Sequence, residues 1–233
     1  AVFCWGFGLI GELGQGNEDS QRVPVRVPGL TGVKQISMAG FSCALLADGS
    51  VKCWGDYDSG VGDPAPSGSK SPTLVNGATG IVEIATTGSG GCGRTAQGDV
   101  KCFGWGSLRE LSGGRTPKRT AMPVRSVARA KALAGGAGGF CAVVEPSSGG
   151  GNVLCWGSGV HDTLDIQHVV TGDGAWNVWA PVRAKGYDRV LDLAIGGDGS
   201  CARTEAKELA CFQDKKTIAA PAMGLRNVVK VTY

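Results

Sequence analysis

The chain has 233 residues, which is enough to bury a substantial core, and its 23 basic and 20 acidic residues leave a formal net charge of +3. These charges are scattered along the chain, so they give no footprint for nucleic-acid binding. The longest apolar runs are only a few residues, far short of the roughly 20 that cross a bilayer as a helix, which excludes a membrane span within this sequence. The chain begins at Ala1 without a basic and then apolar leader, so we expect a processed protein or a portion of a longer polypeptide.

An internal repeat becomes visible when the cysteines are aligned. Segments of the type Val-Lys-Cys-Trp-Gly recur, with their cysteines separated by 49, 49, 53 and 56 residues, at Cys4, Cys53, Cys102, Cys155 and Cys211. A second cysteine precedes four of these segments, each time after a glycine-rich stretch, at Cys43, Cys92, Cys141 and Cys201. A fixed period of this length indicates a solenoid, a propeller or a related array.

Two further elements recur between the cysteines. Short apolar segments with β-branched residues are expected as strands at Val33–Met38, Ile81–Ala85, Lys131–Ala134, Val190–Ile195 and Val228–Val231. Proline-containing segments lie at Val23–Val27, Ser71–Val75, Met122–Arg125 and Ala180–Arg183. Proline cannot donate to a central ladder, so the second set is expected as edge strands.

Four short strands in each unit of about fifty residues, joined by glycine-rich turns, predict an all-β propeller. A β-sandwich would contain similar strands without the fixed period. We expect one domain over residues 1–233, with four complete repeats and a partial fifth at about residues 2–50, 51–99, 100–152, 153–208 and 209–233.

The turn between the paired cysteines predicts their register. Asp-Gly between apolar residues is a strong hairpin signal, and a three-residue loop of Ala47 to Gly49 would pair Leu46 with Ser50 and place Cys43 opposite Cys53. The fourth unit offers Lys207 where the first has a glycine, so its turn is expected to be different or strained. Four cross-strand disulfides follow: Cys43–Cys53, Cys92–Cys102, Cys141–Cys155 and Cys201–Cys211.

The alternative is that the cysteines are buried free thiols, but four matched spacings favour disulfides. A zinc site is disfavoured because the pairs lack Cys-x-x-Cys spacing and the chain has only two histidines. Oxidised cysteines would place the protein outside the reducing cytosol, in an extracellular or cell-envelope compartment. Cys4 is predicted to be unpaired, because its hairpin lacks the regular first strand.

The first repeat carries the loop Gly11 to Gly16, the segment Pro24 to Val27 and the run from Cys43 to Gly55, and this pattern declines in the later repeats. With these residues, it resembles one unit of the regulator of chromosome condensation (RCC1-type) repeat family. The cysteine-bearing unit is similar to that of bacterial secreted or cell-surface repeat proteins. This resemblance implies a circular propeller, commonly seven-bladed, whose members bind proteins, chromatin or inhibitor targets through loops on one face. The chain would then be a five-bladed ring or an arc of a seven-bladed one.

Candidate contact residues lie mainly in the long insertion of the fourth repeat. Trp5, Trp54 and Trp156 recur with the repeat and are expected to pack between blades, whereas Trp176 and Trp179 do not recur and could form a contact surface. The same insertion holds the two histidines, which could contact a partner or lie in a solvated polar loop, at His161 and His168.

Gly88–Gly93 fits the pattern GxGxxG but leads into a hairpin and not into a helix, so it does not predict a nucleotide site. A metal or acid–base site could be drawn from His161, His168 and the nearby Asp162 and Asp165, but a solvated polar loop is the favoured interpretation. We therefore predict no catalytic residue, no cofactor and no metal. The sequence therefore favours a protein-interaction or scaffold module in an extracellular or envelope assembly, with a protein as partner and no nucleic acid. The alternative is a lectin-like propeller that binds carbohydrate or a small ligand by stacking on Trp176 or Trp179. An enzyme domain whose site is assembled from loops is a weaker third possibility.

Overall fold

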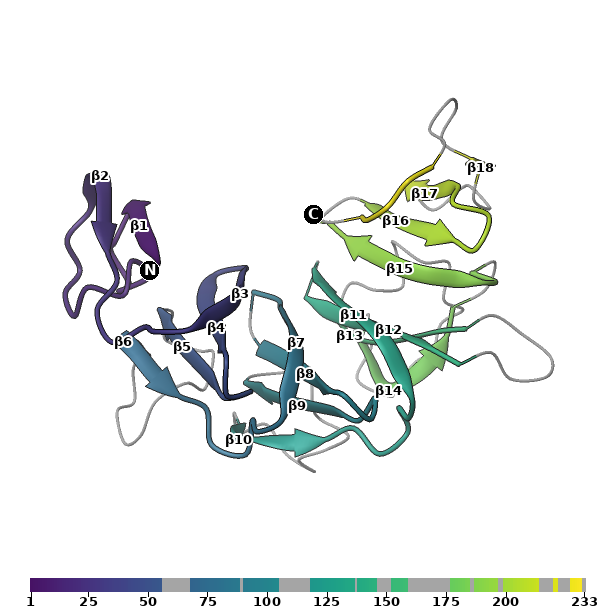
Figure 1. The fold of residues 1–233 in the computed structure, drawn as a ribbon, viewed down its shortest axis with the longest axis horizontal. Coiled ribbons are helices and arrows are strands. Elements are labelled where there is room, and N and C mark those ends of the chain that lie inside the picture. Colours follow the sequence, from purple (N-terminus) through teal and green to yellow (C-terminus); the bar gives the residue numbers. More distant parts are fainter. Residues whose placement is uncertain are drawn as a thin grey trace.

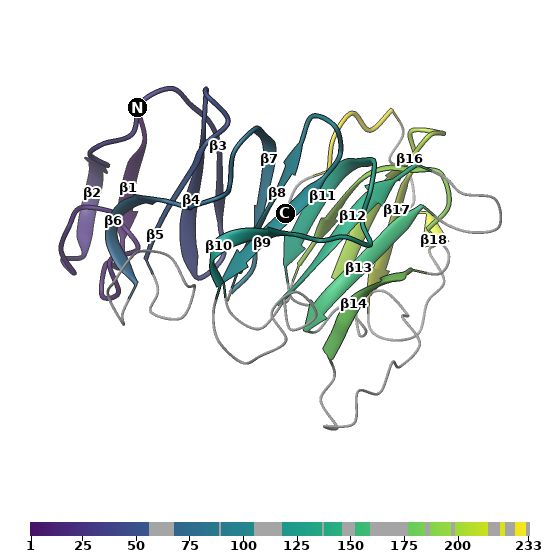
Figure 2. The same cartoon turned by 90° about the horizontal axis from the view of Figure 1, so that it is seen from below.

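A computed structural model describes the chain at residues 1–55, 68–88, 90–104, 118–136, 138–145, 152–158, 177–184, 187–196, 199–213, 220–221 and 227–231. In these ranges every helix or strand element is a β-strand, and the strands form four four-stranded sheets and one two-stranded sheet. The sheets follow one another along an open arc whose two ends are the two ends of the chain (Figures 1 and 2). This arrangement is the predicted all-β propeller architecture. None of the described residues forms a helix that could span a membrane.

Each four-stranded sheet is one blade whose strands are antiparallel and follow chain order. The first complete blade consists of β3 (Val33–Met38), β4 (Phe41–Leu46), β5 (Val51–Gly55) and β6 (Ser69–Leu74). The second consists of β7 (Ile81–Thr86), β8 (Gly90–Thr95), β9 (Val100–Gly104) and β10 (Lys118–Pro123). The third consists of β11 (Ala130–Gly136), β12 (Gly139–Val144), β13 (Val153–Ser158) and β14 (Asn177–Arg183). The fourth consists of β15 (Val190–Ile195), β16 (Gly199–Thr204), β17 (Leu209–Gln213) and β18 (Ala220–Pro221).

The two-stranded sheet at the N-terminal end of the arc is a half-blade of β1 (Phe3–Gly6) and β2 (Gln21–Arg26). These strands correspond to the third and fourth strands of a complete blade. The proline-containing strands β6, β10 and β14 lie at sheet edges, as predicted, because a missing N–H costs nothing where no further strand pairs. The first strands β3, β7, β11 and β15 lie side by side along the inner side of the arc (Figure 1).

The hairpin between the second and third strands keeps one geometry in the first blade and in the fourth. The amide of Leu46 donates to the carbonyl of Ser50 at 2.9 Å, and Gly49 lies in the left-handed region with a φ of 79°. Lys207 has a φ of 58° and donates to the carbonyl of Thr204 at 2.9 Å, so the fourth turn is built in the same way. The expectation of a different turn was therefore wrong, and the strained alternative holds, because a side chain at positive φ is unfavourable.

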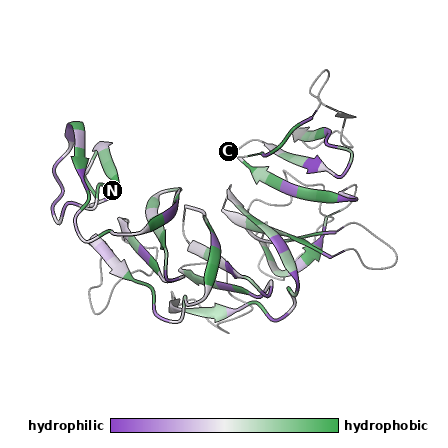
Figure 3. Ribbon diagram, in the orientation of Figure 1, coloured by the Kyte–Doolittle hydropathy of each residue, from purple (hydrophilic) through white to green (hydrophobic). Residues whose placement is uncertain are grey.

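The core lies between neighbouring blades. Phe41, Leu45 and Val51 of the first blade pack in one buried cluster with Ile81 and Phe103 of the second. Two similar clusters join the second blade to the third and the third to the fourth. Hydrophobic stretches run along the strands of the sheets (Figure 3). Each blade therefore depends on its neighbour for burial, as in other repeat architectures.

The segment predicted as a strand at Val228–Val231 carries no strand assignment in the structure, although its backbone is seated against the fourth blade. The amide of Val228 donates to the carbonyl of Lys207 at 3.3 Å, and the amide of Val231 donates to Oδ2 of Asp192 at 3.4 Å. A strand is assigned from a hydrogen-bonded ladder, and no ladder partner for this segment lies within the described part of the chain.

Candidate functional site

At one edge of the arc, the third strand of each blade ends and its connection to the fourth strand begins. In four of these strands, β1, β5, β9 and β13, an aromatic residue is followed by a glycine at positive φ, at Gly6 (110°), Gly55 (100°), Gly104 (103°) and Gly157 (105°). The chain leaves these four strands with the same backbone turn, whereas β17 ends at Gln213. We call this side of the arc the loop edge. The connection between β1 and β2, residues 7–20, lies there and is described in full.

The β1–β2 connection is clamped onto the next blade. The carbonyl of Glu12 accepts a hydrogen bond from Nε1 of Trp54 at 2.9 Å and one from Oγ of Ser42 at 3.3 Å. Leu13 is buried beside Trp54 in a shared cluster. Gly14 lies so close that an added Cβ would be 2.8 Å from Nε1 of Trp54. The Gly-Glu-Leu-Gly motif is thus a clamp that seals one blade against the next.

The first residues of the same connection, which precede the clamp in the chain, expose apolar side chains to solvent. Phe7 is 79% exposed, Leu9 is 67% exposed and Ile10 is 38% exposed. The amide of Ile10 donates to Oε2 of Glu12 at 2.8 Å, which ties this tip to the clamp. Exposed apolar residues held on an anchored loop form a small preorganised contact surface. We call Phe7, Leu9 and Ile10 the apolar tip.

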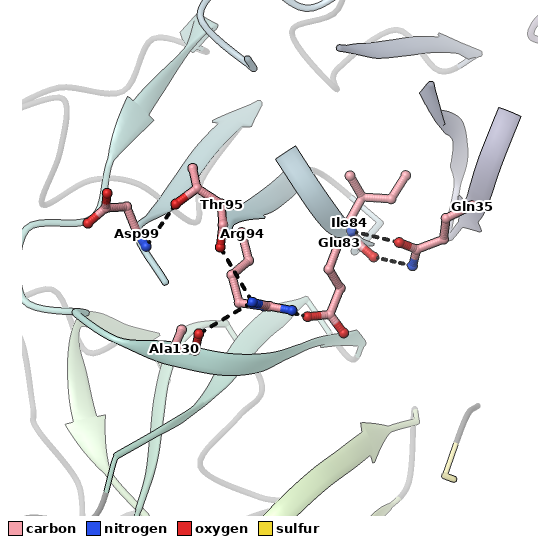
Figure 4. A network of polar contacts seen from close by, with 7 residues as sticks. All are labelled: Gln35, Glu83, Ile84, Arg94, Thr95, Asp99 and Ala130. Atoms are coloured by element: carbon pink, nitrogen blue, oxygen red, sulfur yellow. Dashed lines mark hydrogen bonds and ion pairs between the residues drawn. The ribbon is translucent and has the colours of Figure 1, made fainter. Parts of the chain in front are cut away.

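Polar side chains connect neighbouring blades along the inner strands (Figure 4). Nε2 of Gln35 donates to the carbonyl of Ile84 at 2.8 Å, and the amide of Ile84 donates to Oε1 of Gln35 at 2.9 Å. In the next blade, Nε of Arg94 donates to Oε2 of Glu83 at 2.7 Å, and its Nη1 reaches the carbonyl of Ala130 at 3.5 Å. The Gln35–Ile84 and Arg94–Ala130 bonds join neighbouring blades, whereas the Arg94–Glu83 pair joins two strands of the second blade, so their role is structural.

Similar polar contacts recur farther along the chain, one within the fourth blade and one between the third and fourth blades. Asp192 pairs with Nε of Arg203 at 3.1 Å, as Glu83 pairs with Arg94. Asn152 is buried and exchanges two bonds with the backbone of Val190, at 2.8 and 3.0 Å. Sequence reasoning missed these contacts. A signal was present, since a polar residue occupies the third position of three inner strands, at Gln35, Glu83 and Asp192.

In the part of the chain that the structure describes, three groups have shifted pKa values, and none of them forms a reactive pair. Burial raises the pKa of the Tyr187 hydroxyl far above its usual value, and Ser200 lies in hydrogen-bond contact with it at 2.8 Å. Desolvation raises the pKa of the Cys4 thiol. Hydrogen bonds from Ser50 lower the pKa of the exposed Asp48 carboxyl in the hairpin turn. Among the described residues, no group of three or more His, Cys, Asp or Glu could hold a metal ion.

The structure places the predicted site residues in two classes. The eight cysteines named for pairing are joined by disulfide bonds as Cys43–Cys53, Cys92–Cys102, Cys141–Cys155 and Cys201–Cys211, and Cys4 is a buried free thiol. His161, His168 and Trp176 lie outside the described residues. The backbone of Trp179 lies in β14, and its side chain is outside the description. The four disulfides are consistent with an oxidising compartment.

Comparison with known proteins adds a family model and several relatives. The model of the regulator of chromosome condensation (RCC1) repeat matches residues 1–46. The chain is 32% identical over 126 residues to the E3 ubiquitin-protein ligase HERC2 of Homo sapiens, which covers 52% of this chain and 2% of that protein. It is 26% identical over 246 residues to the mitochondrial RCC1 domain-containing protein RUG3 of Arabidopsis thaliana, which covers 97% of this chain and 53% of that protein.

Among solved structures, yeast RCC1 (Prp20), crystallised with Kap60, has the same fold. The TM-score is 0.77 at 20% identity, and the match covers 97% of this chain and 58% of that one. The chain thus spans about half the length of RUG3 and a small fraction of the length of HERC2. The RCC1 repeat model matches the first 46 residues, and the blade order is that of the yeast RCC1 propeller, so these comparisons support an RCC1-type repeat protein with a β-propeller fold.

Proposed function

We propose that this chain is a non-catalytic protein-interaction module that binds a partner through the loop edge, in an extracellular or cell-envelope assembly. RCC1-type propellers are a family of interaction and regulatory modules, which supports the general class. The yeast relative was crystallised bound to Kap60, so a propeller of this fold can hold a protein partner. Fold alone does not assign a function, so the proposal depends on the site.

The observation that carries the proposal is the apolar tip on its clamped loop. Its side chains belong to a connection that the Trp54 and Ser42 bonds fix in place, so docking would cost little ordering entropy. The blade framework is built in the same way from repeat to repeat, whereas the sequences that join third to fourth strands differ in each. A blade framework that repeats, with connections that differ in sequence, suits recognition of one partner. Residues in these connections can change the binding specificity without loss of the core.

The compartment is inferred from the four disulfides, since such bonds persist outside the reducing cytosol. The carbohydrate-binding alternative stays a prediction, because Trp176 and the side chain of Trp179, which motivate it, lie outside the described part of the chain.

Site-specific photo-crosslinking tests the loop edge. A photoreactive amino acid replaces Leu9 in the apolar tip in one variant and the exposed Asp48 in the other, which lies in a hairpin turn between second and third strands. Both proteins are expressed in the native source and irradiated. We expect one defined protein adduct from the Leu9 position, at least tenfold stronger than from the Asp48 position. Equal labelling from both, or adducts from Asp48 alone, would contradict the proposal.

A further inference from the structure

The outer strand of the first complete blade, β6, carries hydroxyl side chains where two other outer strands carry apolar ones. β6 lies on the outer side of the arc (Figure 1). The residues that face the third-strand cysteines in register are Val25 in β2, Thr73 in β6 and Val182 in β14. Two positions earlier, the same strands hold Val23, Ser71 and Ala180. Because the three strands pair in the same way, pairing does not explain the hydroxyl groups of β6.

The three hydroxyl groups of β6 differ in what they bond to. Oγ of Ser69 donates to the carbonyl of Ser71 at 2.6 Å, and Oγ1 of Thr73 donates to the same carbonyl at 3.0 Å. The hydroxyl of Ser71 bonds to none of the residues that the structure describes, and Ser71 is exposed. A side chain at position 16 would crowd this hydroxyl, since an added Cβ on Gly16 would lie 3.3 Å from it. Ser71 therefore carries the accessible hydroxyl of this strand.

The backbone around Ser71 is held extended at the edge of its sheet. β6 is the last strand of its blade, so no described strand of that sheet lies beyond it. Pro72 restricts the residue before it to extended conformations and lacks an amide for further pairing. The amide of Gly16 donates to the carbonyl of Lys70 at 2.9 Å, and Lys70 pairs with Glu18 at 3.0 Å. An enzyme can therefore bind this segment as an extended strand without unfolding the blade.

The sequence that leads into Ser71 has the composition of a segment that carries sugars. Residues 63–73 read Asp-Pro-Ala-Pro-Ser-Gly-Ser-Lys-Ser-Pro-Thr, so they hold three of the ten prolines of the chain together with four hydroxyl residues. Serine and threonine combined with proline are typical of O-glycosylated segments. The four disulfides are consistent with an oxidising compartment, in which a protein on its way out of the cytosol meets glycosyltransferases.

We propose that Ser71 is an O-glycosylation site, modified by a glycosyltransferase that binds the free edge of β6. The donor is an activated sugar whose anomeric carbon carries a diphosphate leaving group. A bond forms between Oγ of Ser71 and the anomeric carbon, and the bond from that carbon to the diphosphate oxygen breaks with its electron pair. The hydroxyl proton passes to a base of the transferase. The inference rests on the compartment in the proposed function and not on the partner at the loop edge.

Peptide mapping of the protein purified from its source tests the proposal. Proteolysis after Lys70 and Arg94 gives a peptide of residues 71–94, and fragmentation that preserves side-chain modifications locates a sugar within it. We expect most copies of this peptide to carry a sugar on Ser71. An unmodified Ser71, a phosphate on Ser71, or a sugar only on other residues of the peptide would each overturn the proposal.

Two variants expressed in the same source separate the acceptor from its neighbour. Ser71→Ala introduces the residue that the third blade has at the equivalent Ala180, so the strand is expected to form. Ser69→Ala removes a hydroxyl that is already bonded within the strand. We expect Ser71→Ala to abolish the sugar on this segment and Ser69→Ala to retain it, with unchanged circular dichroism spectra. Equal loss of sugar in both folded variants would contradict the assignment to Ser71.

The same map, made without reduction, separates failure of this inference from failure of the proposed compartment. Four intact disulfides together with a bare Ser71 would overturn the sugar alone. Reduced cysteines together with a bare Ser71 would overturn the compartment as well. Neither result bears on the loop-edge partner, which the crosslinking at Leu9 tests separately.

Discussion

The half-blade β1–β2 and the complete blade β3–β6 carry almost the same third strand and meet different surroundings. Phe3-Cys4-Trp5-Gly6 and Lys52-Cys53-Trp54-Gly55 share the cysteine, the tryptophan and the glycine at positive φ. Trp54 is completely buried and hydrogen-bonded, whereas Trp5 is mostly exposed. The local motif sets the strand and its exit turn, and the neighbouring strand and clamp loop decide burial.

Alanine substitution of the two tryptophans gives the largest expected contrast. Trp54→Ala should lower the free energy of unfolding by about 3–5 kcal/mol, because it empties a buried site between blades. Trp5→Ala should change it by no more than about 0.5 kcal/mol, as at other exposed positions. Denaturant titration followed by circular dichroism measures both. Similar losses for the two variants would show that the half-blade is packed like a complete blade.

Removal of a disulfide should have the next largest effect. Replacing Cys43 and Cys53 together by alanine should cost about 2–3 kcal/mol, since the bond restricts the unfolded chain. Cys4→Ala removes only a buried thiol and should cost about 1 kcal/mol or less. Thermal melting of the two variants, each without reductant, gives the comparison. A Cys4→Ala loss as large as that of the pair would mean that Cys4 is bonded in the protein studied.

A smaller contrast tests the clamp hydrogen bond. Trp54→Phe deletes the donor to the Glu12 carbonyl, whereas the buried Nε1 of Trp156 has no hydrogen-bond partner among the described residues. Trp54→Phe should therefore cost about 1 kcal/mol more than Trp156→Phe, the net contribution of a typical hydrogen bond. The difference in denaturation midpoint measures it. A greater loss at Trp156 would contradict a role for the bond in sealing the blades.

The smallest expected effect is a gain in stability. Lys207→Gly should stabilise the fourth blade by up to about 1 kcal/mol, because glycine accepts the left-handed backbone that lysine holds under strain. Gly49→Ala in the equivalent turn should destabilise, since its φ is 79° and an added Cβ would lie 3.2 Å from the backbone of Ile81. Melting temperatures that move in the same direction for both variants would contradict this account of the turn.

The strand order and the hairpin register were accessible from sequence because they depend on local signals. Asp48-Gly49 and the equal spacing from Cys43 to Cys53 and from Cys92 to Cys102 define a hairpin whatever surrounds it. The turn at Lys207 was harder to predict, because blade packing imposes the same geometry on a residue that disfavours it. Contacts such as Gln35 with Ile84 join residues 49 positions apart, which no local signal reports.

Sequence by itself determined the repeat, the all-β class, the edge position of the proline-bearing strands and the pairing partners within each hairpin. These features follow from periodicity, turn chemistry and the missing proline N–H, which act over a few residues. Only the tertiary structure decided that Trp5 is exposed while Trp54 is buried, that the Glu12 carbonyl clamps the next blade, and that residues 228–231 seat without a ladder partner among the described strands. The physical reason is that burial and inter-blade hydrogen bonds belong to pairs of blades, and a single repeat does not contain its neighbour.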